Sequence, residues 1–430
     1  MGKLYKPQPS TFRDFLNQQY MIFGIFAMLF ITFLTVFSTQ RAIKWTGYEF
    51  FKLTHWVVAI LYVGACWGHW KQLYCWMVPS LALIVIDQAI RGLRILALHY
   101  RGGQGEPRGF KSAQATLQLL ETTSTDQILR LDFDYPHRTP WSPGQHFYLT
   151  FPSLSLWQAH SYTPSSLPSP SPRISQHHTY IIRARSGQSA QLVALARSGT
   201  TSLPVILTGP YGNAHPQHQT DNLLAVAGGT GVSFTYPIAL ACLRQMIVPQ
   251  AFVEFVWIIR RAEDLLWLKE EMVLLREMLT KTACLRVKVF VTREARLEGL
   301  APGSSGSSSS ETGSQSDGSS GVVDFEKLGV GARAREVGER GLSRQGVLDL
   351  FFGNAAADKK GDGCFKVEFL AGAHPDLGQV VEGFMERVGE RGGCVEVVGS
   401  GPEALGSRLR EAVAGVQTQE SLGFYWDSRG

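Results

Sequence analysis

The chain has 430 residues, enough for two or three domains, and a mild formal net charge of +5 at pH 7. It has no Lys/Arg-rich tract with interleaved aromatic residues, so the sequence does not indicate a nucleic-acid-binding protein. Its six cysteines form no CxxC motif and no paired spacing, which argues against a disulfide scaffold or a zinc site.

The first hundred residues carry most of the long apolar runs and predict a membrane segment over residues 1–100. An uncharged run at about 20–38 is long enough for a helix to cross a bilayer core of about 30 Å. Further spans are predicted at about 50–70 and 74–90, although Asp87 interrupts the end of the last one. The basic residues after the first and third spans place the soluble remainder in the cytosol by the positive-inside rule.

The predicted second span contains two histidines, His55 and His69. Their spacing corresponds to about 21 Å along a helix axis and to nearly the same helix face. Histidines inside a membrane are functional by default, and two stacked haems would need one such pair from each of two facing helices. Two unrelated polar residues near the interfaces are the alternative. The sequence supplies only one such pair, because His99 lies beyond the third span.

Residues 112–216 predict a small antiparallel barrel. Alternating segments at 115–120 and 128–133 are typical of strands, and a turn at Pro143-Gly144 leads into another strand at 146–151. A short segment then offers aromatic rings beside hydroxyl donors, which suits a flat ring such as a flavin. A hairpin with surface polar residues is the alternative. The residues of this segment are His160, Ser161, Tyr162 and Thr163.

A strand at 179–185 and the loop after it form a candidate pyrophosphate site. Arg183 could bind through its guanidinium, and Gly187, Gln188 and Ser189 could bind through backbone donors, although an ordinary turn explains them equally well. A strand at 204–207 then enters a rigid turn that closes this domain. The turn consists of Gly209, Pro210, Tyr211 and Gly212.

Residues 217–426 alternate strands and helices, which predicts a parallel α/β sheet. A strand at 222–227 leads directly into a glycine turn and a helical pattern, a layout that directs helix amides at a phosphate. The spacing differs from the dinucleotide GxGxxG motif. The turn consists of Gly228, Gly229, Thr230, Gly231, Val232 and Ser233.

The next strand, 252–259, ends in Arg260-Arg261, well placed for a 2′-phosphate and therefore for NADPH over NADH. A solvated strand end is the alternative. A Gly/Ser-rich stretch predicts a disordered insertion over about 300–345. A last strand at 394–398 leads to the Gly401-Pro402 turn, and Trp426 near the end of the chain could cover a flavin face or simply pack.

These motifs occur in a definite order: the membrane histidine pair, a PGQ strand, the His-x-Tyr-Thr segment, GPYG, GGTGVS, VWIIRRAEDL and GSGPE. The order resembles the fungal ferric-chelate reductases, membrane flavocytochromes related to the NADPH oxidases, over essentially the whole chain. The resemblance implies a multidomain, ferredoxin-reductase-like fold. An α-helical membrane segment would precede an antiparallel β-barrel FAD-binding domain at 112–216 and an α/β parallel-sheet NADP-binding domain at 217–426.

The resemblance also implies roles for individual residues. Ser400 stands where the family has the cysteine of its Cys-Gly-Pro motif, near the point of hydride transfer, and is the candidate catalytic residue. His55 and His69 would ligate haem b. The segment 160–163 would contact the flavin, Arg183 and 187–189 would lie near the FAD pyrophosphate, and 209–212, 228–233 and 400–402 would line the NADPH site.

The implied function is a transmembrane ferric-chelate reductase that passes electrons from NADPH through FAD and haem to ferric chelates outside the cell. A multi-pass protein of the plasma membrane, with both nucleotide domains in the cytosol, is expected. The resemblance begins at the family's fourth membrane helix, as in a truncated gene product or an incomplete gene model. A partner chain could supply the missing haem ligands. The alternatives are an NADPH oxidase that makes superoxide and a non-catalytic or regulatory membrane fragment.

Overall fold

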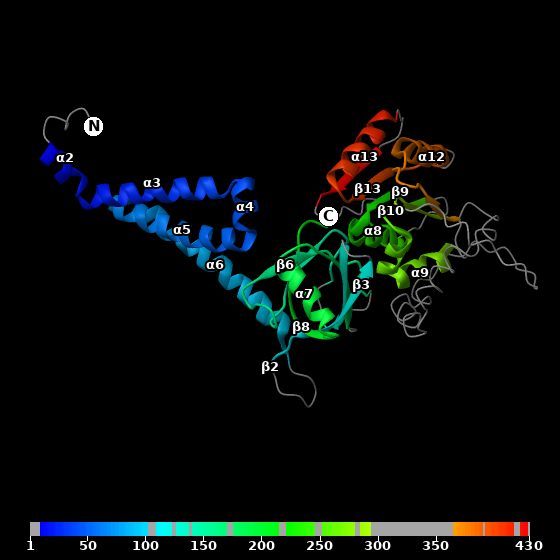
Figure 1. Cartoon of the computed structure of the whole chain (residues 1–430), viewed down its shortest axis with the longest axis horizontal. Coiled ribbons are helices and arrows are strands. Elements are labelled where there is room, and N and C mark those ends of the chain that lie inside the picture. The colour runs from blue at the N-terminus through cyan, green and yellow to red at the C-terminus, as the bar shows by residue number, and fades with distance from the viewer. Residues whose placement is uncertain are drawn as a thin grey trace, which may run out of the picture. The chain divides into compact units, whose positions relative to one another are not determined.

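The computed structural model shows a chain of two compact units, Met1–Ala97 and Leu98–Gly430, each of which is described by itself (Figure 1). The predicted insertion at 300–345 lies outside the residues that the structure describes. The described residues are 9–101, 109–122, 126–136, 140–169, 175–214, 221–245, 252–279, 284–293, 364–389, 392–416 and 422–428.

The first unit is helical. Two of its stretches, Gln19–Phe37 and Phe50–His69, are long and apolar enough to cross a membrane. The predicted third span is also helical but is not among these stretches. Its helix carries an ion pair between Asp87 and Arg91 at 2.8 Å. The helices are α2 (Pro9–Leu16), α3 (Gln19–Phe37), α4 (Gln40–Thr46), α5 (Tyr48–His69), η1 (Lys71–Leu73) and α6 (Tyr74–His99).

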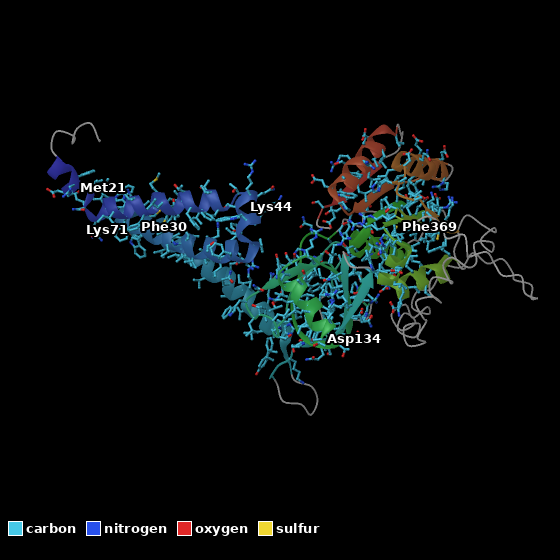
Figure 2. All side chains as sticks on the ribbon, viewed as in Figure 1. Met21, Phe30, Lys44, Lys71, Asp134 and Phe369 are labelled. Carbon is cyan, nitrogen blue, oxygen red and sulfur yellow. The ribbon has the colours of Figure 1, made fainter. Side chains whose placement is uncertain are left out.

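Large apolar side chains on these helices are exposed, as expected of helices that face lipid. Met28 on α3, Leu53 on α5 and Leu83 on α6 each expose about two thirds of their surface, and Figure 2 shows the side chains projecting from the helices. Helices α3 and α5 run antiparallel, with Tyr20 beside the end of α5 and Ser38 beside its first half. A glycine at position 24 permits this close approach, because a Cβ there would lie 2.7 Å from the ring of His69.

The second unit begins with an antiparallel sheet of six strands in the order β6-β5-β8-β3-β4-β7. Buried and half-buried residues alternate along β5, and side chains such as Leu131, Phe147 and Leu149 are fully buried. The strands are β3 (Ala113–Thr122), β4 (Asp126–Tyr135), β5 (His146–Thr150), β6 (Ala159–Tyr162), β7 (Gln176–Ala184) and β8 (Ser202–Tyr211), with helix α7 (Gln188–Arg197) and a small ribbon of β1 (Tyr100–Arg101) and β2 (Gly109–Phe110).

The two outer strands of this sheet are joined by the chain that follows β6. The amide of Ser165 donates to the carbonyl of Thr179 on β7 at 2.8 Å. The hydroxyl of Ser166 donates to the carbonyl of His177 at 2.8 Å and accepts from the amide of Thr179 at 3.1 Å. These bonds close the sheet into a barrel, as the sequence predicts.

The last residue of α6, His99, is fully buried in this second unit. The amide of Leu207 on β8 donates to its Nε2 at 3.1 Å, so that in the neutral ring Nδ1 carries the hydrogen. Nδ1 lies 2.8 Å from the carbonyl oxygen of Lys111 and 2.8 Å from the hydroxyl of Tyr135 on β4. One imidazole therefore connects the end of α6 to β4, β8 and the segment before β3.

The rest of the second unit is a parallel sheet of six strands in the order β12-β11-β10-β9-β13-β14 (Figure 1). Its central strands are buried on both faces, which explains their continuous apolar sequences. The fold class predicted from the sequence is confirmed: a helical segment, an antiparallel barrel and a parallel α/β sheet. The elements are β9 (Asn222–Gly228), η2 (Gly229–Gly231), α8 (Val232–Gln245), β10 (Phe252–Ile259), η3 (Ala262–Leu268), α9 (Lys269–Leu279), β11 (Leu285–Val291), β12 (Cys364–Phe369), α12 (Leu377–Gly389), β13 (Val395–Ser400), α13 (Glu403–Gly415) and β14 (Leu422–Asp427).

Candidate functional site

Two glycine-containing turns meet where the strand order of the parallel sheet reverses, between β9 and β13. Such a switch point is where open α/β sheets bind ligands, at the carboxyl ends of the strands. A Cβ on Gly231 would lie 2.3 Å from the carbonyl oxygen of Ser400, so only glycine allows the turns to touch. The indole of Trp257 donates to the carbonyl of Gly229 at 3.0 Å and holds the first turn in place. The predicted phosphate-binding turn thus opens α8 at the switch point.

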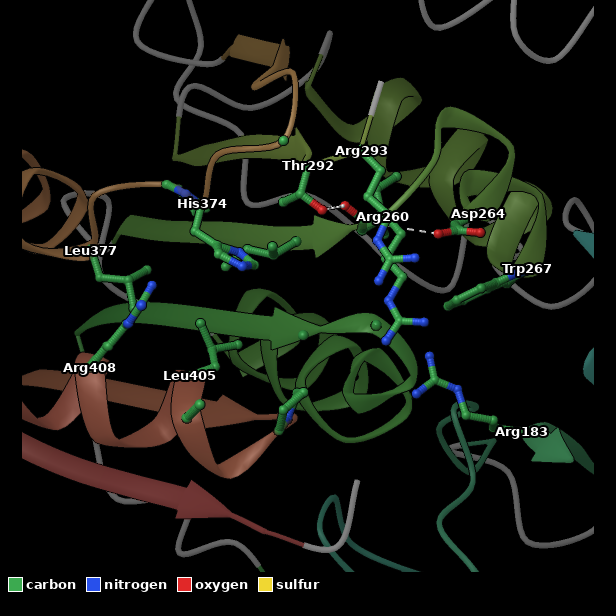
Figure 3. Close-up of a pocket in the computed structure, with 18 residues that line it drawn as sticks. Arg183, Arg260, Asp264, Trp267, Thr292, Arg293, His374, Leu377, Leu405 and Arg408 are labelled. Atoms are coloured by element: carbon green, nitrogen blue, oxygen red, sulfur yellow. Dashed lines mark hydrogen bonds between the residues drawn. The ribbon is translucent and has the colours of Figure 1, made fainter. Parts of the chain in front are cut away.

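A cavity of about 390 Å³ lies at these strand ends (Figure 3). Five residues that the sequence singles out line it, and the other lining residues, three of them basic or imidazole side chains, were not predicted. The predicted residues are Arg183, Gly228, Gly229, Arg260 and Pro402, and the three basic or imidazole ones are Arg293, His374 and Arg408.

The cavity is strongly cationic, since four of its lining residues are arginines. Figure 3 shows Arg183, Arg260 and Arg293, which come from different strands, extending side by side toward the same space. The carboxylate of Asp264 also lines the cavity, but it accepts hydrogen bonds from the amides of Arg260 and Arg261 at 3.0 and 3.1 Å. Guanidinium groups in this number suit a ligand with several phosphates.

The unpredicted residue Arg293 lies two residues after β11, as Arg260 lies one residue after β10, and its amide donates to the carbonyl of Arg260 at 2.9 Å. His374 comes shortly after β12. The carboxyl ends of neighbouring parallel strands share one sheet edge, so the argument that selects Arg260 could have found Arg293 as well. Nothing in the sequence distinguishes Arg408 from the other charged residues of α13.

Several predicted residues lie beside the cavity without lining it. Arg261 and Ser400 are absent from its wall, and Ser400 is only 1% exposed. Val232 is fully buried in the core. The hydroxyl of Ser233 donates to the carbonyl of Thr230 at 3.0 Å, so this donor is used within the turn itself. The catalytic role of Ser400 stays a prediction.

The start of α7, next to Arg183 in the sequence, has the features of a second phosphate site. Gly187 precedes the helix with a φ of +61°, and the hydroxyl of Ser189 donates to the carbonyl of Ser186 at 3.0 Å. Gln188 is 3% exposed, yet its amide nitrogen and oxygen have no hydrogen-bond partner within the described part of the chain. A buried amide needs a partner, and a bound pyrophosphate with its ribose would supply one.

The segment His160–Thr163 places polar groups on both faces of the barrel wall. His160 pairs with Leu149 and Tyr162 with Phe147, so both share the face of the buried core residues. Ser161 pairs with Tyr148 and is exposed on the other face. Burial raises the pKa of Tyr162 to about 12, which keeps its phenol neutral and able to donate a hydrogen bond.

The turn Gly209–Gly212 lies at the end of β8, and β5 separates it from this segment. The ring of Tyr211 is 5.5 Å from that of Tyr148 and 6.3 Å from that of His146. None of the four turn residues lines the cavity. The structure thus places 209–212 in the barrel wall, two strands from His160–Thr163.

Trp426 is held inside the parallel-sheet domain. A Cβ on Gly399 would lie 2.5 Å from its ring, and a Cβ on Gly406 would lie 2.4 Å from it. The indole therefore packs between β13 and α13. This favours a packing role for Trp426 over the covering of a flavin face. Its neighbour Tyr425 is 37% exposed and stacks on Phe234, with ring centroids 5.8 Å apart.

The two membrane histidines both direct Nδ1 toward α3. Nδ1 of His69 lies 2.6 Å from the carbonyl oxygen of Tyr20. Because a carbonyl oxygen only accepts, Nδ1 must carry the hydrogen, which leaves the lone pair of the neutral ring on Nε2. Nδ1 of His55 lies 3.5 Å from the hydroxyl of Ser38, which itself approaches the carbonyl of Leu34. A histidine held through one nitrogen is arranged as metal-ligating histidines are.

Comparison with protein-family models finds three matches in series. Residues 2–66 match the ferric reductase like transmembrane component, and residues 110–215 match an FAD-binding domain. Residues 220–414 match the ferric reductase NAD binding domain. The three matches follow the helical unit, the barrel and the parallel sheet in order.

Similar curated proteins are fungal. The chain is 28% identical to ferric/cupric reductase transmembrane component 2 of Saccharomyces cerevisiae over 223 residues, 50% of this chain and 28% of that protein. It is 26% identical to ferric reductase transmembrane component 6 of the same yeast over 293 residues, 65% of this chain and 37% of that protein. It is 24% identical to the probable cell surface ferric reductase kap2 of Aspergillus oryzae over 251 residues, 54% of this chain and 31% of that protein. The chain thus spans well under two thirds of these relatives.

Two similar solved structures illustrate the comparison with known folds. A ferredoxin NADP⁺ reductase from Neisseria gonorrhoeae with bound FAD and NADP is 10% identical, with a TM-score of 0.40, over 74% of this chain and 99% of that one. The ferredoxin reductase in carbazole 1,9a-dioxygenase is 14% identical, with a TM-score of 0.39, over 73% of this chain and 68% of that one.

Proposed function

Because this chain belongs to the ferric reductase family, we propose that it carries electrons from NADPH through FAD and haem to ferric chelates outside the cell. It is a membrane protein with an FAD-binding domain and an NAD-binding domain. The observation that supports the proposal most directly is the cationic cavity at the switch point of the parallel sheet. It has the charge and the backbone turns that a phosphorylated dinucleotide requires.

NADPH is the proposed donor because two guanidinium groups, those of Arg260 and Arg293, lie together at the ends of β10 and β11. NADPH differs from NADH only by the 2′-phosphate, and paired arginines bind such a dianion well. The glycine turn at 228–231 would hold the pyrophosphate.

FAD is the proposed first acceptor, held by the start of α7, Arg183 and the segment His160–Thr163. The buried amide of Gln188 would gain its partner from the bound cofactor. When bound, FAD takes a hydride, which is two electrons and one proton, and releases electrons one at a time. The chain's own residues bind and orient the ring and keep the Tyr162 phenol neutral.

Haem b is proposed at His55 and His69, since a neutral imidazole offers one lone pair to iron and in His69 that lone pair lies on Nε2. Further ligands for these haems would have to come from residues other than this pair, and a partner chain could supply them. A plasma-membrane location, with cytosolic nucleotide domains and reduction at the outer face, completes the proposal.

Absorbance spectra of the purified full-length chain in detergent test the whole scheme. A Soret band together with flavin absorbance, both changed on adding NADPH, is the expected result. We expect His69→Ala to reduce the Soret band and leave the flavin absorbance intact. Flavin alone, with reduction of soluble dyes, would remove the haem step, and superoxide formation without chelate reduction would favour the oxidase. The absence of both chromophores would contradict the proposal.

We expect His160→Ala to weaken FAD binding roughly tenfold, through loss of one hydrogen-bonding ring beside the flavin. The measurement is the flavin content of the purified protein together with FAD titration of the stripped protein. His177→Ala is the matched control, because His177 is also a partly exposed histidine of the barrel but bonds Asp134 at 2.9 Å. Equal flavin content in both variants would rule out this placement of the flavin.

A further inference from the structure

An arginine on the barrel strand β4 is bonded into the parallel-sheet domain. Arg130 is 7% exposed, and its two terminal nitrogens donate to the two carboxylate oxygens of Glu271 on α9, each at 2.9 Å. Its Nε donates to Asp132 at 2.8 Å. This fork of two parallel bonds fixes both the distance and the relative orientation of the groups it joins.

The network contains more negative than positive charge. Glu270 lies 3.0 Å from Arg130, so one guanidinium faces three carboxylates, those of Asp132, Glu270 and Glu271. Burial alone would lower the pKa of Arg130, but the three acids, Glu271 foremost, raise it well above its ordinary value. Burial raises the pKa of Glu270, and the charge of Arg130 only partly opposes this. Buried ion networks of this kind contribute little net stability, so their geometry is the more informative property.

Arg130 also bonds the wall of the cationic cavity. Its Nη1 donates to the carbonyl of Trp267 at 3.2 Å, and Trp267 lines the cavity at the end of η3. The same short helix contains Asp264, which accepts from the amide of Arg260. The ring of Trp267 meets that of Trp257 edge-on at 6.2 Å, and Trp257 holds the glycine turn.

We propose that Arg130 is a positioning residue that fixes the nucleotide cavity relative to the flavin barrel. The inference rests on the proposed function, because its consequence is the distance over which the hydride passes from the nicotinamide to the flavin. Ile128 and Ile181 of the barrel join the apolar core of the parallel-sheet domain, so the two domains are also in contact without Arg130. The apolar contact holds the two domains together, and the bidentate bond between Arg130 and Glu271 fixes their relative orientation.

The test uses the full chain, loaded with FAD, and the variants Arg130→Gln and Glu271→Gln. The matched control is Glu254→Gln. Glu254 is fully buried and pairs with Lys288 at 2.8 Å and with Arg387, entirely inside the parallel-sheet domain. Both networks are buried carboxylate–cation networks, and only that of Arg130 joins the two domains.

We expect Arg130→Gln to slow flavin bleaching by NADPH in a single turnover by roughly tenfold to a hundredfold. The affinity for 2′,5′-ADP should fall far less than the bleaching rate, because Arg260 and Arg293 stay in the cavity and the probe does not extend to the flavin. The Arg130→Gln/Glu271→Gln double variant should be little slower than either single variant. Glu254→Gln should lower the melting temperature and leave the bleaching rate unchanged.

A second readout needs no cofactor. In the stripped protein, amide hydrogen exchange over 260–268 should speed up in Arg130→Gln and stay unchanged in Glu254→Gln. If Arg130→Gln does not fold, Arg130→Lys keeps the charge, loses the fork and should show the same slowing. Unchanged bleaching and exchange in the Arg130 variants, or equal slowing in Glu254→Gln, would overturn the inference. If NADPH does not bleach the flavin of the unaltered protein, the proposed function is overturned instead.

Discussion

Replacing Gly231 with alanine is expected to lower the free energy of unfolding of the parallel-sheet domain by about 3 kcal/mol. The new methyl group would lie 2.3 Å from the carbonyl oxygen and 2.5 Å from the carbonyl carbon of Ser400. These are backbone atoms of a buried strand end, so they cannot rotate away as a flexible side chain would. The turn must therefore shift, and its amide N–H groups then no longer point toward the phosphate.

Thermal unfolding and calorimetric NADP⁺ binding of the full chain would measure both effects of Gly231→Ala. Gly415→Ala is the matched control, because a Cβ on Gly415, the last residue of α13, would meet nothing within 4 Å. We expect that variant to keep the unaltered stability or to gain a little. Equal melting temperatures and equal NADP⁺ affinities for the two variants would show that the turns do not touch in the protein.

Replacing Arg260 with alanine is expected to weaken NADP⁺ binding roughly tenfold to a hundredfold and to leave NAD⁺ binding nearly unchanged. The reason is the loss of a charged hydrogen bond to the 2′-phosphate, worth about 1.5–3 kcal/mol. Arg293→Ala should act in the same direction, since the two side chains extend side by side into the cavity (Figure 3).

Arg261→Ala provides the control for this prediction. Arg261 is the sequence neighbour of Arg260, has the same charge and does not line the cavity. Calorimetric titrations of the three variants with NADP⁺ and NAD⁺ would compare them directly. A loss of NADP⁺ affinity in Arg261→Ala as large as that in Arg260→Ala would reject the assignment, and so would an equal loss of NAD⁺ affinity.

Much of the fold was predictable because its signals are local. The glycine turn after 222–227 follows an apolar strand and precedes a helix, and this order alone predicts a phosphate site at a strand end. The choice between Arg260 and Arg261 was not predictable, since both follow the same strand and only the structure shows which one lines the cavity. Arg293 was missed although the same rule applies to β11.

Other features depend on contacts between distant segments. Arg130 meets Glu271 across 141 positions of sequence, and no periodicity or motif connects them. The place of Trp426 depends on Gly399 and Gly406, two small residues whose role appears only when β13, β14 and α13 come together. Aromatic residues near a chain end have many possible neighbours, and sequence alone does not select one.

The burial of His99 has a practical consequence for biochemistry. The sequence motifs alone would place the first residue of a water-soluble fragment with both nucleotide domains near residue 110. Such a fragment would lack the imidazole that satisfies the Leu207 amide and the Lys111 carbonyl inside the barrel. A fragment should therefore begin no later than Leu98, so that Leu98 and His99, the last two residues of α6, stay attached to the barrel.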